Sequence, residues 1–133
     1  MTSPAGPTAP DSTAAPLAPV TTASAEHYVW GAQCDGWYLV RTAGLTVIQE
    51  RVPPGAAEAR HRHARARQFF FVLAGELRLD VEGTSHLLRA QTGLEVAPGQ
   101  AHAVVNPHAT EDAHFLVVSS PSTQGDKELL SPP

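Results

Sequence analysis

The sequence predicts an all-β protein, a β-sandwich or barrel of seven or more short strands. Apolar runs of strand length, rich in Val, Leu and aromatic residues, recur at close spacing from about residue 27 onward. Clusters of Gly, Pro, Asn and Asp separate these runs. No window of helical length has a sustained 3.6-residue apolar period, so we expect no helix.

The expected strands follow one another along the chain with little between them. They are predicted at 36–40, 45–52, 68–75, 76–81, 86–90, 102–105 and 114–120. Turn sequences such as AGLT, PPGA, VEGTS, APGQ and NPHATED lie at the connections. A chain of 133 residues has room for one domain with one core, and strands at this spacing are typical of sandwiches and barrels.

Three segments differ in composition. Residues 1–25 are almost wholly Pro, Ala, Thr, Ser and Gly, which cannot bury enough surface to offset their ordering entropy, so we expect a disordered tail. Residues 26–121 should form the barrel. Residues 122–133 are polar and end in Pro, which predicts either a tail or a flap that could bring Asp126 and Lys127 over one end of the barrel.

Composition and charge exclude several classes of function. The formal net charge is −4, without the basic excess that a nucleic-acid partner requires. No apolar run approaches the roughly 18 residues of a membrane span, and the N-terminus has no secretory pattern, so we expect a cytoplasmic protein. Cys34 is the only cysteine, which predicts a buried thiol and no intramolecular disulfide.

His61 and His63 are separated by one residue, with Gln68 five positions further on. Side chains two apart on a strand point to the same face, so both imidazoles would project together. Two such nitrogens lie close to a common point and favour a metal site, although an isolated H-x-H pair also arises by chance.

The spacing around these histidines resembles the first motif of the cupin superfamily, G-x5-H-x-H-x(3,4)-E-x6-G. The chain has Gly55, His61, His63 and Gly75 at matching positions, and Gln68 stands where the motif has glutamate.

A second stretch, APGQAHAVVN, resembles the second cupin motif, G-x5-P-x-G-x2-H-x3-N. Gly99, His102 and Asn106 match it, whereas Gln91 replaces the first glycine and Ala97 replaces the proline. Together the motifs imply the cupin double-stranded β-helix, a jelly-roll-like barrel with both motifs facing its interior.

The resemblance also implies a metal site. His61, His63 and His102 would be ligands, and Gln68 would contribute an oxygen to one divalent transition metal, Zn, Ni, Fe, Cu or Mn. A neutral glutamine leaves the ion its full double charge, so anions should be attracted more strongly. Some small cupins that act on sugar acids are similar in having a His, His, Gln, His set. The alternative is that Gln68 does not bind metal and that the barrel has no catalytic role.

Strand phase predicts the pocket and the outer surface. The residues expected on the ligand face are Phe70, Val72, Val104 and Asn106. Phe69, Phe71 and Leu73 would then point outward, and outward aromatics need a cover. We therefore expect a homodimer.

Two further residues are candidates for proton transfer. His114 lies in the last expected barrel strand and could face the cavity as a proton shuttle. Glu58 precedes His61 by three positions, which on a regular strand places it on the opposite face, so we expect a surface or interface carboxylate rather than a general base. Arg60 and Arg62 should also face solvent.

Two hypotheses of function remain open. One is a metal-dependent enzyme of isomerase, lyase or dioxygenase type that acts on a small polar or anionic metabolite. The alternative is a non-catalytic cupin module that binds a small molecule or a metal. The chain has no G-x-S-x-G elbow, phosphate-binding loop or paired cysteine motif, which argues against acyl transfer and nucleotide chemistry.

Overall fold

The computed structural model describes residues 17–131, and every regular element in this range is a β-strand. The strands are β1 Glu26–Trp30, β2 Cys34–Arg41, β3 Thr46–Val52, β4 His61–His63, β5 Arg67–Ala74, β6 Glu76–Val81, β7 Thr84–Arg89, β8 Gly93–Val96, β9 His102–Val105, β10 Ala113–Ser120 and β11 Lys127–Leu129. Nothing in the described range is a helix that could span a bilayer.

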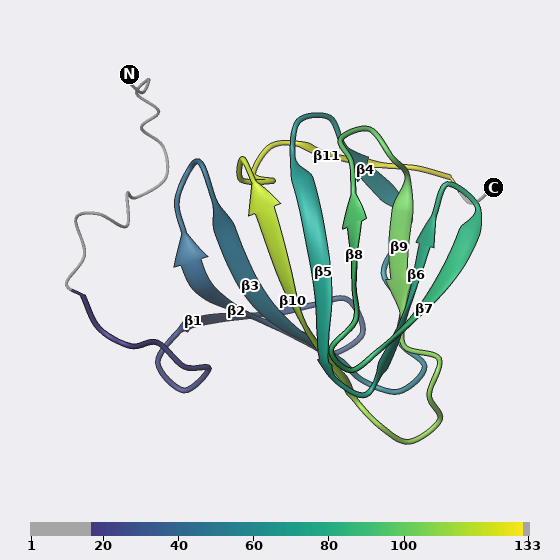
Figure 1. Cartoon of the computed structure of the whole chain (residues 1–133), viewed down its shortest axis with the longest axis horizontal. Helices are drawn as coiled ribbons and strands as arrows, with labels where there is room; N and C mark the ends of the chain where they lie inside the picture. The colour runs from purple at the N-terminus through teal and green to yellow at the C-terminus, as the bar shows by residue number, and fades with distance from the viewer. Residues whose placement is uncertain (1–16, 132–133) are drawn as a thin grey trace.

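The strands form two antiparallel sheets (Figure 1). The larger sheet has the order β1-β2-β3-β10-β5-β8, and the smaller has the order β11-β4-β9-β6-β7. Apart from the β6–β7 hairpin, the chain passes from one sheet to the other at each connection between β3 and β10. This path is the predicted double-stranded β-helix, and the all-β fold class is confirmed.

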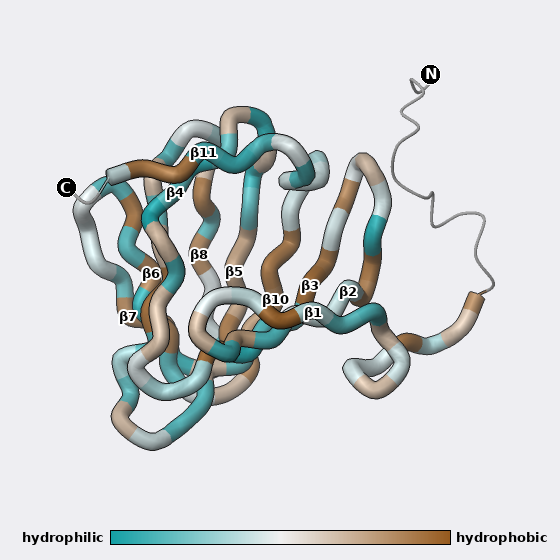
Figure 2. The backbone as a smooth tube through the Cα atoms, turned by 180° about the vertical axis from the view of Figure 1, so that it is seen from behind, coloured by the Kyte–Doolittle hydropathy of each residue, from teal (hydrophilic) through white to brown (hydrophobic). Residues whose placement is uncertain are grey.

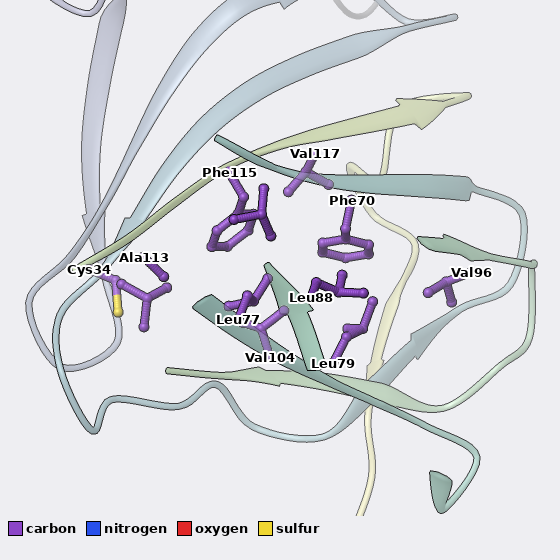
Figure 3. Close-up of a cluster of buried hydrophobic side chains, with 12 residues drawn as sticks. Cys34, Phe70, Leu77, Leu79, Leu88, Val96, Val104, Ala113, Phe115 and Val117 are labelled. Carbon is purple, nitrogen blue, oxygen red and sulfur yellow. The ribbon is translucent and has the colours of Figure 1, made fainter. Parts of the chain in front are cut away.

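The core lies between the two sheets and follows the two-residue period of the strands. On β10 the buried residues Ala113, Phe115, Val117 and Ser119 alternate with more exposed neighbours. Figure 3 shows apolar side chains of both sheets meeting in the interior. They include Phe70, Phe115 and Val117 from the larger sheet and Leu77, Leu79 and Val104 from the smaller. Burial of each large side chain contributes about 1.5–3 kcal/mol.

Parts of the chain on either side of the central barrel are also described. Residues 1–16, most of the expected disordered tail, lie outside the described residues. In the described remainder, Ser24 and Ala25 donate backbone hydrogen bonds to Thr21 in a turn before β1. After β10 the chain returns to the smaller sheet, where β11 pairs with β4 (Figure 2).

Candidate metal centre

Strands β4 and β9 bring three histidines together in the interior. His61 and His63 are buried on either side of exposed Arg62, and His102 pairs with His61 across the two strands. The three side chains offer nitrogens that all lie within 4.8 Å of one another. The residues are only 4, 6 and 2 % exposed. Surface histidines have no reason to converge in this way, so the spacing is that of a metal-ligand set.

The backbone orients two of the imidazoles. His61 Nδ1 lies 2.9 Å from the carbonyl oxygen of Ala59, and His102 Nδ1 lies 2.9 Å from that of Gln100. A carbonyl only accepts, so each Nδ1 carries the proton and each Nε2 keeps its lone pair. Such outer contacts are typical of metal-bound histidines, since they fix both tautomer and ring orientation.

Several buried polar atoms at this centre have no hydrogen-bond partner. Across the described residues five side-chain atoms are in this state, and His63 Nδ1, Gln68 Oε1 and His102 Nε2 are three of them. An unpaired buried polar atom costs about 1–3 kcal/mol. Gln68 is buried on β5, and its Nε2 donates to Ser119 Oγ at 3.1 Å, which leaves Oε1 as a free acceptor. The residues therefore fit a metal ion, which would satisfy such atoms.

Burial keeps the three imidazoles in the form that binds metal. It lowers the pKa of His61 to about 4, although the hydrogen bond to the Ala59 carbonyl acts in the opposite direction. Burial also lowers the pKa of His63 and of His102, and the positive charge of Lys127 acts in the same direction. All three side chains are thus neutral near pH 7, as ligation requires.

The four residues predicted to wall the pocket are all buried. Phe70 presents its ring to His102 at a centroid distance of 5.9 Å and an interplanar angle of 69°. Val72 and Val104 belong to the core cluster. Asn106 instead holds a loop, because its Nδ2 donates to the carbonyls of Val52 and Glu111 and its Oδ1 accepts from the His108 amide.

The structure places His114 away from the three histidines. On β10 it alternates with buried Ala113 and Phe115, so it lies on the outer face of the larger sheet. The expected orientation toward the cavity is not found, because the apolar neighbours take the inward positions. We do not give His114 a role in the proton chemistry below.

The expectation of a surface carboxylate at position 58 is wrong. The Glu58 side chain is only 17 % exposed, and its Oε2 lies 4.0 Å from His61 Nδ1. Its Oε1 accepts a hydrogen bond from the Val104 amide at 3.1 Å. The segment before β4 is not a regular strand: it pairs only through an isolated bridge between Ala57 and Val105, so simple alternation does not hold. Burial raises the pKa of Glu58 to about 7.

A second interior carboxyl group, Glu50, was not anticipated. It lies on β3 in register with Gly36 on β2 and with inward-facing Phe115 on β10. Tyr28 Oη donates to Glu50 Oε2 at 3.4 Å. Burial, followed by the negative charge of Glu58, raises the pKa of Glu50 to about 8.

Gly36 makes the contact between Tyr28 and Glu50 possible. A Cβ atom at this position would lie 2.2 Å from Tyr28 Cζ and 2.5 Å from Oη. The tyrosine ring therefore crosses β2 where there is no side chain. Glu50 lies two residues before buried Val52, so strand alternation alone could have predicted that it faces the interior. No feature of the local sequence predicts the contact with Tyr28.

Asp126 does not form a charged pair with Lys127 over the opening. Its carboxylate accepts hydrogen bonds from the backbone amides of Ala64, Arg65 and Ala66, in the turn after β4. Burial alone would raise the pKa of Asp126, but these amides lower it. Asp126 thus ties the start of β11 to the segment that carries His63.

The fold and the histidine centre together define a small β-barrel with a candidate metal site in its interior. The model of the family described as "Cupin domain" matches residues 48–119, and the chain belongs to this family. The predicted resemblance is confirmed. A search of curated proteins found no match.

Solved structures with the same fold include three small cupins. An RmlC-like cupin from Shewanella frigidimarina is 23 % identical, with a TM-score of 0.70 over 77 % of this chain and 89 % of that chain. A predicted oxalate decarboxylase from Thermotoga maritima is 17 % identical, with a TM-score of 0.69 over 77 % and 98 %. A sugar phosphate isomerase of the cupin superfamily from Silicibacter pomeroyi is 22 % identical, with a TM-score of 0.65 over 77 % and 75 %. These likenesses show the fold alone.

Proposed function

We propose that this cupin is a metal-dependent enzyme of isomerase, lyase or dioxygenase type that acts on a small polar or anionic metabolite. The observation that carries the proposal is the convergence of three buried imidazoles. The same interior holds a glutamine oxygen, Gln68 Oε1, that has no hydrogen-bond partner. Such a centre is costly in a purely structural core, because its polar atoms lack partners.

His61, His63 and His102 would hold one divalent transition metal through imidazole nitrogens, with Gln68 Oε1 as a weaker oxygen ligand. The three nitrogens and the amide oxygen suit Zn, Ni, Fe, Cu or Mn. When bound, the ion would supply Lewis acidity or redox chemistry at a substrate oxygen. Because none of the four ligands carries a negative charge, the centre would favour anionic substrates.

Glu50 is our candidate for moving a proton in the barrel interior. A group with a pKa of about 8 is available in both protonation states near neutral pH, which general acid–base catalysis requires. Tyr28 holds one carboxyl oxygen, which leaves the other for a substrate proton. Glu58 accepts a hydrogen bond from the Val104 amide and lies 4.0 Å from His61 Nδ1, which the Ala59 carbonyl already holds, so we give Glu58 no proton-transfer role.

The descriptions of two solved cupins support the proposed substrate class. One is described as a sugar phosphate isomerase and one as a predicted oxalate decarboxylase. Both descriptions concern small oxygen-rich anions, as we propose here. Since one fold hosts many reactions, the choice of reaction needs its own experiment.

Turnover of a panel of keto acids, uronic acids and sugar phosphates, before and after chelation, tests the proposal. We expect at least one member to react, with loss of the rate on chelation and recovery on metal addition. Glu50→Gln should lower kcat by about 100-fold or more, in the range of a lost general base, while metal content stays unchanged. A rate that survives both chelation and His102→Ala would contradict the proposal.

The non-catalytic module is the second candidate, and Gln68 is the residue that favours it. A neutral ligand in place of a carboxylate binds a metal less strongly, which suits a site that senses an ion or a ligand. Protein that binds metal and panel members but converts none of them would support this candidate.

A further inference from the structure

Lys127 lies on the same face of the smaller sheet as the histidines. In the antiparallel pairing of β11 with β4, Lys127 is opposite His63 and Leu129 is opposite His61. Directly opposed residues on antiparallel strands project to the same side. The intervening pair confirms this phase, because Glu128 and Arg62 form an ion pair at 2.9 Å on the exposed face.

The contacts around β11 fix Lys127 relative to the histidines. Before it, Asp126 binds the amides of the turn after β4. After it, the Leu130 amide donates to the Arg60 carbonyl at 2.9 Å, and Arg60 Nη1 donates to the Ser131 carbonyl at 3.0 Å. Figure 2 shows β11 running alongside β4 at this rim of the barrel. Lys127 is itself exposed, so it is an anchored cation between the interior and solvent.

The neighbouring arginines are already engaged, whereas Lys127 is not. Arg62 pairs with Glu128, Arg65 with Asp126 and Arg67 with Glu95. Arg60 is held by the Ser131 carbonyl. Within residues 17–131, no carboxylate lies within ion-pair distance of Lys127.

We propose that Lys127 binds the carboxylate or phosphate group of a small ligand whose other end reaches the histidines. This inference rests on the proposed small-molecule site and adds the anchor that selects an anion. A lysine ammonium is a point charge with three donors, and it accepts either anion without a fixed geometry. A ligand held between Lys127 and His63 would be compact, since cross-strand neighbours have Cβ atoms about 5 Å apart.

The experiment measures anion affinity with full-length, zinc-loaded protein. Malonate and inorganic phosphate are the anionic probes, and malonamide is the neutral probe, each titrated by calorimetry. We expect Lys127→Met to weaken binding of at least one anion by about tenfold, the scale of one charge-assisted hydrogen bond, and to leave malonamide unaffected. Lys127→Arg should stay within about threefold of wild type, because the charge is kept.

Glu128→Gln is the matched control on the same strand. It alters the outward-facing neighbour of Lys127 and should leave anion affinity within about twofold, since a surface ion pair contributes little. Comparison of the two anions distinguishes a carboxylate ligand from a phosphate ligand. Lys127→Met protein that binds both anions within twofold of wild type would overturn the inference, as would wild type that binds neither below 10 mM.

Metal content measured on the same samples separates this inference from the proposed function. If Lys127 governs anion binding while no metal is retained, the metal-dependent enzyme is contradicted and the anion site stands. If metal is retained in full and Lys127→Met has no effect, only the anion site fails.

Discussion

His102 at the start of β9 lies directly across from His61 on β4, and their ring centroids are 4.4 Å apart. This pairing joins the two motifs that the sequence holds some forty residues apart. His63 completes the cluster from the next inward position of β4. The candidate metal centre therefore depends on one short contact between strands of the smaller sheet.

Substitution of the four candidate ligands should lower metal affinity by unequal amounts. His102→Ala should lower metal affinity by more than about 100-fold, because loss of an outer partner alone costs about 10- to 100-fold. Gln68→Ala should lower it by less, since a neutral amide oxygen is the weakest of the four ligands. Gln68→Glu is the matched variant and should retain metal. Competition with a chromogenic chelator gives the affinities, and equal losses for His102→Ala and Gln68→Ala would contradict the ligand order.

In metal-free protein, the free energy of unfolding should decrease as the pH falls from about 6.5 toward 4. His61 has a folded pKa of about 4 against about 6.5 when unfolded, so the unfolded chain binds more protons between these values. The contribution of His61 is therefore present above pH 6.5 and is lost as the pH falls toward 4. Denaturant titration of wild type and His61→Gln from pH 7 to 4 measures it. The stability difference between the two proteins should change over this range, and a constant difference would be inconsistent with a lowered pKa.

Glu50 should make the folded protein less stable as the pH rises, the opposite of the effect of His61. Its folded pKa of about 8 exceeds the ordinary value of 4.5, so the folded protein keeps a proton that the unfolded chain loses. Stability is therefore lost progressively from pH 4.5 to 8. In chelated protein, Glu50→Gln should gain stability relative to wild type as the pH rises over this range. If the difference in free energy of unfolding between Glu50→Gln and wild type did not grow with pH, Glu50 would be ionised in the folded protein.

Gly36→Ala should disrupt the contact between Tyr28 and Glu50. The added methyl group would lie 2.2 Å from the tyrosine ring, so the ring must move, at a cost of about 1–3 kcal/mol in the free energy of unfolding. Gly44→Ala is the matched control, because a Cβ there meets nothing within 4 Å, and it should change stability by about 0.5 kcal/mol or less. Equal effects of the two variants in urea titrations would argue against the placement of Tyr28.

We predict a homodimer through the outer face of the larger sheet. Phe69 is 42 % exposed and stacks on Phe71, with a centroid distance of 6.2 Å. Val118 and Val47 continue the same cross-strand row as Phe69. Light scattering should give twice the chain mass of 14.1 kDa at micromolar concentration, and Phe69→Glu should give the monomer mass. A monomeric wild type would leave the outer aromatics without a partner.

Much of the fold and of the metal centre follows from local pattern. Each of the seven predicted strands overlaps an observed one, because each carries an apolar run of strand length bounded by turn residues. Strands β1, β4, β8 and β11 lie outside these seven ranges, although the histidines of β4 were expected to alternate as on a strand. Strands β8 and β11 are short and pair with strands distant in the sequence, whereas β1 is a polar strand that forms a hairpin with β2.

The polar side chains around the centre were harder to predict. Tyr28 meets Glu50 through the register of β1 with β2, and exposed Lys127 lies opposite His63 through the register of β11 with β4. Sequence spacing encodes neither register. Glu58 departs from strand alternation because its segment is irregular. His114 could have been assigned outward, because the neighbouring Phe115 is the better core residue.

The metal centre is tested best by the metal content of full-length protein, purified without a metal-binding tag after growth in supplemented medium. Elemental analysis should find close to one first-row divalent ion per chain, lost from His102→Ala and retained in Gln68→Glu. Chelation should lower the melting temperature while the barrel remains folded, because the ion binds only the native centre. Less than a tenth of an equivalent of any metal in wild type would contradict the metal centre and leave only the cupin fold.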